Sequence, residues 1–129
     1  MLRLEDLEVY RLAEQIADEV WDICSSWDSF SRDTLGKQIV RAADSIGANI
    51  AEGYGRYAYK ENIHFCYYAR GSLMETMYFL RRTMKRKLMT SEQEINLKKI
   101  TEPMGIKLNA YIKSIKLQIT KTSVKVTND

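Results

Sequence analysis

The sequence predicts an all-α protein, an up-down-up-down antiparallel four-helix bundle. Four segments of roughly 20 to 30 residues carry apolar residues at three- and four-residue spacing, which places those residues on one helix face. The alternation with a period of two that half-buried strands show is absent. One proline and six glycines in 129 residues leave little room for long loops. Helices of this length joined by short connections pack as antiparallel neighbours.

The first predicted helix runs from about Leu4 to Ser26, and the second follows a short polar connection. Ser31 or Asp33 is expected to cap the second helix, because either side chain can accept a hydrogen bond from the first turn. The second helix is expected to stop at Gly53-Tyr54-Gly55, where a glycine can take the left-handed closing conformation. The predicted core-facing residues are Val9, Leu12, Ala13, Ile16, Val20, Ile23 and Trp27, then Leu35, Ile39, Ala42, Ile46 and Ile50.

The third predicted helix runs from about Tyr59 to Leu88, and the fourth from Thr90 to about Thr120. Two overlapping capping boxes, Thr90 with Gln93 and Ser91 with Glu94, mark the start of the fourth helix. The predicted core-facing residues are Ile63, Cys66, Leu73, Met77, Leu80 and Met84, then Leu97, Ile100, Met104, Leu108, Tyr111, Ile115 and Ile119. We therefore expect a single domain over residues 1–121 and a flexible C-terminal tail over 122–129.

Composition favours a cytoplasmic protein. The N-terminal residues are charged and lack the apolar run of a signal peptide. No stretch approaches the ~18 apolar residues that a membrane span needs, so we expect no membrane partner. Cys24 and Cys66 form no CxxC pair and fall among apolar helix positions, which indicates two buried, reduced thiols.

The net charge of +3 hides a difference between the two halves of the chain. Residues 1–64 carry seven Lys or Arg against twelve Asp or Glu, a net charge of −5. Residues 65–129 carry thirteen against five, a net charge of +8. This division fits an anionic partner on one side, association of unlike faces, or pairing of the halves inside the bundle.

Catalytic and metal sites find little support in the sequence. Glu61 and His64 match the Glu-x-x-His pair of di-iron bundles, but such sites need a second pair and further carboxylates, and this chain has only one histidine. No serine or cysteine stands in the context of an activated nucleophile. We expect a protein that is not an enzyme, with no metal, no cofactor and no small-molecule substrate.

The end of the third predicted helix is strongly basic, with five positive charges in the seven residues 81–87. Cations there suit the negative end of the helix dipole, and they can equally bind phosphates or serve solubility and subunit pairing. Tyr67 and Tyr78 share a face with part of this run, and such aromatics can stack on bases. The candidate nucleic-acid-binding residues are Arg81, Arg82, Lys85, Arg86 and Lys87, with Lys113 and Lys116 as secondary contributors.

Apolar residues also lie off the predicted core faces of the last two helices. Ile95, Ile106 and Leu117 are eleven residues apart and align opposite the core face of the fourth helix, which indicates packing against another subunit. The candidate interface residues of a homo-oligomer are Phe65, Tyr68, Phe79, Ile95, Ile106 and Leu117.

A stripe of hydrogen-bonding residues runs beside the core face of the second predicted helix. It is expected to form either one buried polar network that fixes helix register, or a contact with a ligand or subunit. The residues of this polar stripe are Gln38, Arg41, Ser45, Asn49, Glu52 and Arg56.

Four segments in order, LEDLEVYRLA, QIVRAADSI, NIAEGYGR and ARGSLMET, resemble a small bacterial "four helix bundle protein" family. Its members are also called intervening-sequence or S23 proteins, because some are encoded within insertions in large-subunit rRNA genes. The resemblance implies a bundle that forms rings of five and a relation to the nucleic-acid-binding accessory variability determinant of diversity-generating retroelements. The chain departs from the family pattern at Gly47, Ala58, Asn62 and His64.

Two functional hypotheses follow. The first is a non-enzymatic homopentamer that acts as an accessory scaffold binding RNA or DNA. The alternative is a protein-interaction or structural assembly without nucleic acid.

Overall fold

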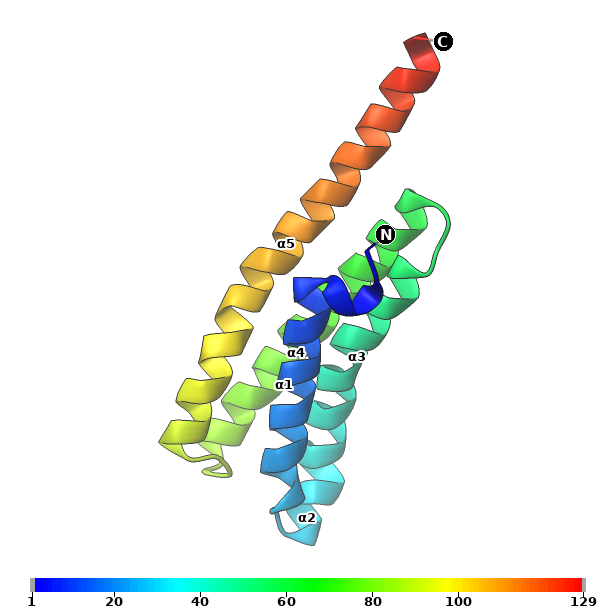
Figure 1. Cartoon of the computed structure of the whole chain (residues 1–129). Coiled ribbons are helices and arrows are strands. Elements are labelled where there is room, and N and C mark those ends of the chain that lie inside the picture. Colours follow the sequence, from blue (N-terminus) through cyan, green and yellow to red (C-terminus); the bar gives the residue numbers. More distant parts are fainter. Residues whose placement is uncertain (1, 129) are drawn as a thin grey trace.

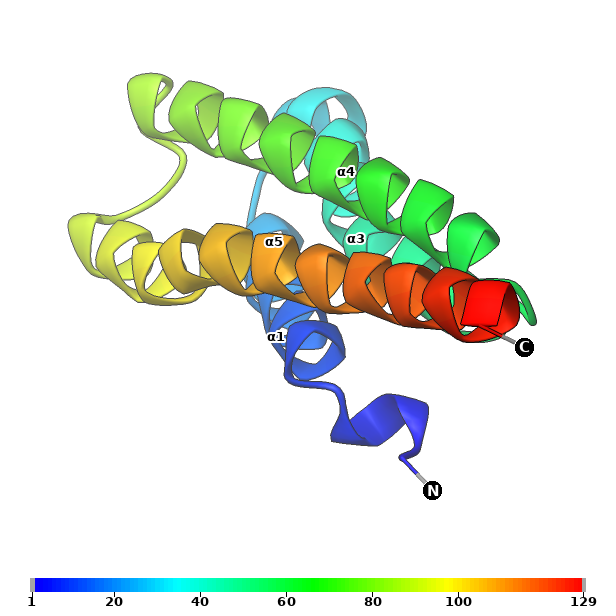
Figure 2. The same ribbon diagram turned by 90° about the horizontal axis from the view of Figure 1, so that it is seen from above.

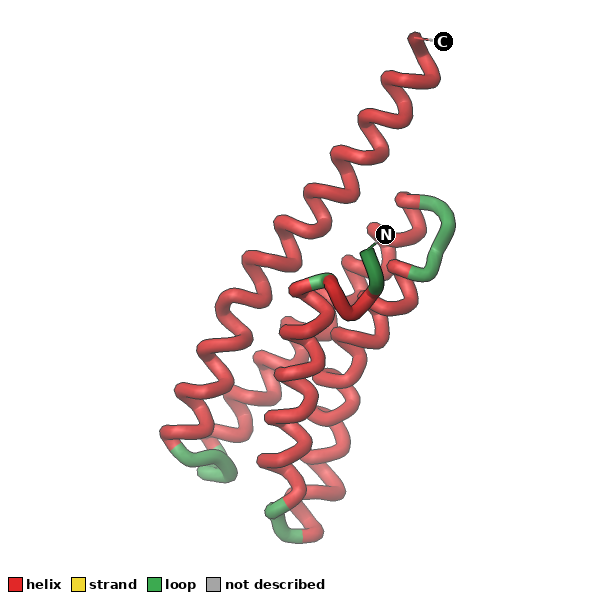
Figure 3. Tube along the Cα trace, in the orientation of Figure 1, coloured by secondary structure: helices red, strands yellow, loops and turns green. Residues whose placement is uncertain are grey.

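The protein is all-α, as the sequence predicts. The structure is a computed structural model that describes the backbone of residues 2–128 and the side chains of residues 2–121. Four long helices run alternately up and down (Figure 1). They are α1 (Glu8–Ser25), α3 (Lys37–Tyr54), α4 (Tyr59–Lys85) and α5 (Ser91–Asn128). The described backbone contains no strand, and only short loops join the helices (Figure 3).

Each long helix packs against two others. Helices α3 and α5 both contact α1 and α4, so α1 and α4 form one diagonal of the bundle. Seen from above, α1 and α4 lie on opposite sides of α5 (Figure 2). The side made by α1 and α3 is consequently opposite the side made by α4 and α5.

The core consists of the apolar faces that the sequence predicts, because residues at three- and four-residue spacing point to the same side of each helix. Ile16, Ile46 and Leu108 are fully buried at its centre. Three threonines that the pattern did not predict are also buried, Thr76, Thr83 and Thr101. Thr76 and Thr83 can be buried because each hydroxyl donates to a carbonyl one turn earlier, at 2.8 Å.

The second predicted helix begins earlier than expected. Asp28 caps it by accepting a hydrogen bond from the backbone N–H of Ser31 at 2.9 Å, so neither Ser31 nor Asp33 is the cap. Three helical segments then follow without a loop: α2 (Ser29–Ser31), the π-helical turn η2 (Arg32–Gly36) and α3. The capping bonds lower the pKa of Asp28, because they stabilise its charged form.

Helix α3 ends without the left-handed glycine that the sequence suggested. No described glycine has a positive φ, and Gly55 closes the helix with φ −76°. Gly53 is needed for a different reason, which is the close approach of α4. A Cβ atom at Gly53 would lie 2.7 Å from the Asn62 Oδ1 atom and 2.9 Å from the Phe65 Cβ atom.

The turn from α4 to α5 contains the only described non-glycine residue with a positive φ, Lys87 at 58°. The following residue, Leu88, donates its N–H to the Thr83 carbonyl at 3.0 Å, as in a Schellman motif. The Trp27 indole N–H donates to the Leu88 carbonyl at 2.8 Å, which ties this turn to the end of α1.

Helix α5 starts with one of the two predicted capping boxes. The Thr90 N–H donates to Gln93 Oε1 at 2.9 Å, and the Gln93 N–H donates to Thr90 Oγ1 at 3.1 Å. The helix continues past Thr120, where the sequence pattern predicted its end. The expected flexible tail, 122–129, lies outside the residues described with their side chains and stays a prediction.

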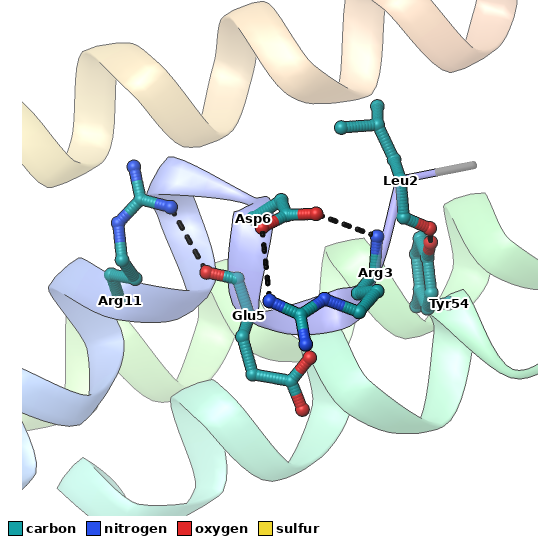
Figure 4. Close-up of polar contacts among 6 residues, drawn as sticks. All are labelled: Leu2, Arg3, Glu5, Asp6, Arg11 and Tyr54. Carbon is teal, nitrogen blue, oxygen red and sulfur yellow. Dashed lines mark hydrogen bonds and ion pairs between the residues drawn. The ribbon is translucent and has the colours of Figure 1, made fainter.

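The chain before α1 forms a separate short turn, η1 (Leu4–Asp6), instead of extending α1 as predicted. This turn is held at two places (Figure 4). The Tyr54 hydroxyl donates to the carbonyl of Leu2, and the Arg11 guanidinium donates to the carbonyl of Glu5 at 2.9 Å. The N-terminal turn is therefore fastened to both α1 and α3.

Candidate functional surfaces

The basic residues at the end of α4 form one exposed surface, which we call the end cluster. It consists of Arg81, Arg82, Lys85, Arg86 and Lys87. Arg82 is half-buried and the other four side chains are exposed. None of them belongs to an ion pair among the residues whose side chains are described. Their charges are consequently available to an anionic partner.

The structure does not bring the secondary candidates, Lys113 and Lys116, to the end cluster. The Lys116 Nζ atom lies 5.6 Å from the centroid of the Tyr67 ring. Tyr67 and Lys85 are separated by 18 residues of α4, or about 27 Å at the rise of an α-helix. The predicted basic residues therefore belong to separate surfaces.

Around Tyr67 the structure assembles a smaller basic group that the sequence reasoning missed. The Arg70 guanidinium lies 5.0 Å from the Tyr67 ring centroid and donates to Asn109 Oδ1 at 3.1 Å. With Lys116, this places two cations against one aromatic ring. The spacing of Tyr67 and Arg70 by three residues was the available signal, but the contribution of α5 required the tertiary structure.

Next to the end cluster, α4 and α5 enclose an apolar groove with a volume of about 310 Å³. Its apolar lining includes Met77, Leu80, Met84 and Leu97. At its rim, Lys98 is held by an ion pair with Glu94 at 3.0 Å.

The predicted interface residues divide into two groups. Phe65 and Phe79 are half-buried and contact other residues of their own chain; the Arg56 guanidinium lies 4.8 Å from the Phe65 ring centroid. The remaining four are exposed by half or more, and Ile106 by 74%. These four are Tyr68, Ile95, Ile106 and Leu117. Seven further large apolar or aromatic side chains, which the sequence reasoning did not assign to the interface, are also exposed: Leu2, Trp21, Phe30, Tyr57, Tyr59, Met74 and Tyr78.

Lys99 and Lys113 share the exposed side of α5 with three of these apolar residues. At 100° per residue all five fall within about 40° of one another on the helix circumference. We call this surface the outer face of α5. It consists of Ile95, Lys99, Ile106, Lys113 and Leu117.

On the opposite side of the bundle, α1 and α3 form a groove with a volume of about 290 Å³, the α1/α3 groove. Five small residues line it, Ala13, Ala17, Gly47, Ala48 and Ala51, together with Tyr10, Glu14, Asp18 and Asp44. Desolvation, and then the nearby charge of Asp18, raises the pKa of Asp44. None of the three carboxylates belongs to an ion pair among the described side chains.

The polar stripe of α3 makes local contacts instead of one buried network. Ser45 and Asn49 each donate to a carbonyl one turn earlier in their own helix, at 2.8 Å. Glu52 pairs with Arg56 at 2.6 Å on the surface. Gln38 and Arg41 are exposed as well. The alternative hypothesis, a contact with a ligand or subunit, stays a prediction.

The cysteines and the Glu61/His64 pair lie in different environments. Cys24 and Cys66 are buried free thiols, as predicted, and burial raises the pKa of each to about 11. Glu61 and His64 are both exposed. Within the described part of the chain, no three metal-ligating side chains gather, and no helix is long and apolar enough to cross a membrane.

The comparisons with known proteins agree with the fold and with the resemblance seen in the sequence. Residues 5–110 match the family model described as 23S rRNA-intervening sequence protein. A solved structure similar to this chain is a Bacteroides thetaiotaomicron protein of unknown function from the S23 ribosomal protein family. Its TM-score is 0.72, with 24% sequence identity, over 81% of this chain and 98% of that one. At this identity, the likeness shows the fold alone. A search of curated proteins found no match. Because the family match covers residues 5–110, well over half of the chain, the chain belongs to the 23S rRNA-intervening sequence protein family.

Proposed function

We propose that this protein is a non-enzymatic, self-assembling bundle of the cytoplasm that binds nucleic acid through the end cluster. The observation that carries the proposal is the concentration of five cations on the last turns of α4 and the turn that follows, none of them used in a described ion pair. Cations placed against phosphates release condensed counterions, which drives binding with little dependence on base sequence.

Shape and charge support contact with the sugar-phosphate backbone more than reading of bases. The end cluster lies on the last turns of α4 and the turn that follows, where four of its five side chains are exposed, and only Arg81 also lines the neighbouring apolar groove. The net charge of the chain is only +3, so attraction depends on the local concentration of positive charge. We infer a salt-sensitive contact with RNA or DNA. RNA is the first probe, because the family is named after an rRNA sequence.

Self-association would strengthen such binding. The resemblance to ring-forming bundles and the exposed apolar residues of α5 support a homo-oligomer, for which we propose five subunits. In a ring, each copy presents the same end cluster, so several weak contacts act on one nucleic acid.

The test replaces three exposed cations of the end cluster in the variant Arg81→Gln, Lys85→Gln, Arg86→Gln. Glutamine removes charge without adding repulsion at the helix end, and it keeps good helix propensity. Affinity for single-stranded and duplex RNA and DNA is measured at several salt concentrations. The variant should bind much more weakly, with a smaller slope of log affinity against log salt.

The matched control is Lys37→Gln, Arg41→Gln, Lys60→Gln. It removes the same number of exposed charges from the acidic half of the chain and should bind almost as the parent does. Equal losses in both variants would show that only net charge matters. If the parent binds neither RNA nor DNA at low salt, the proposal of nucleic-acid binding is wrong.

The exposed apolar residues favour a second candidate function, a protein-interaction or structural assembly without nucleic acid. This function predicts oligomers that purify free of nucleic acid, with a low ratio of absorbance at 260 nm to that at 280 nm in every buffer.

A further inference from the structure

Two surfaces on opposite sides of the bundle complement each other in shape. The α1/α3 groove is shallow because alanine and glycine line it, which lets another helix approach closely. The outer face of α5 has the complementary shape, because the Ile106 and Leu117 side chains project from it into solvent. A surface of projecting apolar side chains next to charges is typical of protein interfaces.

The two surfaces also complement each other in charge. The groove carries Glu14, Asp18 and Asp44 without a described cation partner. The outer face of α5 carries Lys99 and Lys113 between its apolar residues, and neither belongs to a described ion pair. Asp44 is partly desolvated and lies near the charge of Asp18, so an ammonium group inserted into the groove would relieve a cost that the single chain leaves uncompensated.

One stretch of α5 and the lining of the groove have similar lengths. The stretch from Ile106 to Leu117, which contains Lys113, spans about 16 Å at the helical rise, and the lining on α1 from Tyr10 to Asp18 spans about 12 Å. The carboxylates of the groove lie on neighbouring turns of α1 and on the adjacent part of α3. Only the C-terminal part of α5 runs past the ends of the other helices (Figure 1), and the outer face is accessible because Ile95, Ile106 and Leu117 are each exposed by more than half.

We propose that the α1/α3 groove of one copy takes the outer face of α5 of a second copy, with Ile106 and Leu117 on the small residues and Lys113 against the groove carboxylates. This inference rests on the self-assembly part of the proposed function and adds which surfaces meet. The two surfaces differ and lie on opposite sides of the bundle, so the contact is head-to-tail and repeats from copy to copy. Lys113 then serves assembly, and the end cluster is left to bind nucleic acid.

The test uses two variants that each block one surface. Ala48→Arg places a long cation in the groove at an exposed position, and Ile106→Glu places a carboxylate on the outer face of α5. Each variant alone should sediment as the 15.0 kDa chain at concentrations where the parent is assembled. Circular dichroism checks that both keep the helicity of the parent.

Mixing the two variants provides the decisive measurement. The Ile106→Glu chain keeps an intact groove, and the Ala48→Arg chain keeps an intact outer face. A head-to-tail contact therefore predicts a species of twice the chain mass in the mixture and in neither variant alone. A symmetric contact between two α5 helices predicts no such rescue and would overturn the proposal.

The matched control is Met74→Glu on α4, which changes another side chain that is exposed by 60%. It should assemble as the parent does. Disassembly by Met74→Glu with normal assembly of Ile106→Glu would assign docking to α4 and overturn the inference. A parent that stays at 15.0 kDa would overturn both this inference and the self-assembly proposal. RNA binding by the monomeric variants, measured separately, reports on the end cluster alone.

Discussion

At the scale of single residues, the glycines show how differently one residue type is used in this fold. Gly53 is buried where α4 crosses α3, and a side chain there would collide with backbone and Cβ atoms of α4. Gly71 lies in the middle of α4, and a Cβ atom there would meet nothing within 4 Å. The first glycine is required by packing, and the second has no packing reason within the chain.

Replacing these two glycines by alanine should therefore change stability in opposite directions. Gly53→Ala should lower the free energy of unfolding by about 1–3 kcal/mol, because neither the Asn62 carbonyl nor the Phe65 Cβ atom can move without shifting α4. Gly71→Ala should raise it by up to about 1 kcal/mol, because alanine has the better helix propensity. Urea unfolding of both variants measures the difference. Similar values for the two would contradict the close approach at Gly53.

At the scale of elements, three of the described helix ends are closed by specific local devices. The capping box of Thr90 and Gln93 starts α5, and the Asp28 carboxylate starts the helical run that leads into α3. The turn after α4 uses Lys87 in the left-handed region, where glycine is the usual residue. These devices keep the loops short, and short loops impose the antiparallel order.

The Asp28 cap should make stability depend on pH in the acid range. Its pKa is lower in the folded protein, because the backbone N–H and hydroxyl of Ser31 donate to the charged carboxylate. A carboxyl group with a lowered folded pKa contributes stability above its unfolded pKa of about 3.9, and that contribution is lost as the pH falls through the folded pKa. Asp28→Asn still caps the helix but does not titrate.

Melting temperatures of the parent and Asp28→Asn, measured from pH 7 down to pH 2, test this expectation. Below about pH 4, the melting temperature of the parent should fall further than that of the variant. Parallel curves would show that the folded and unfolded pKa values of Asp28 are equal. Asp33→Asn is the control, because Asp33 is an exposed carboxylate of the following turn that does not cap the helix.

At the scale of the whole molecule, one contiguous core holds all four helices together. Cys24 lies in it near the end of α1, and Cys66 lies in it on α4. Cys66 is fully buried, and Cys24 is exposed by only 4%. They therefore report on opening of the bundle from two separate places.

Both cysteines should react with iodoacetamide only when the bundle opens. The thiolate is the reactive form, and burial raises both pKa values to about 11, so labelling of the folded protein at pH 8 should be very slow. In urea the two sites should become labelled together, at the same denaturant concentration as the loss of helicity. Mass spectrometry of digested protein separates the two sites. Early labelling of Cys24 alone would show that the α1 end opens independently.

The candidate surfaces were only partly predictable from the sequence. The end cluster is continuous in the chain, so composition alone located it. The α1/α3 groove joins residues of two helices whose approach no local pattern specifies. For the same reason Arg70 was missed, and Lys113 was grouped with cations that lie on another surface. The partial burial of Phe65 and Phe79 was not predicted, because helical angle alone does not reveal contacts with neighbouring helices.

The sequence by itself determined the four helices, their core faces, the capping box of α5 and the opposite charges of the two halves. These features depend on spacing and on residue types within one or two turns, so they can be read without a structure. Only the tertiary structure decided which charges share a surface, why Gly53 must be a glycine, and that the polar stripe of α3 bonds within its own helix. The first two depend on distances between atoms of different helices. The third depends on whether a side chain bonds within its own helix or to a distant partner. The packing of the helices determines both the distances and the choice of hydrogen-bond partner.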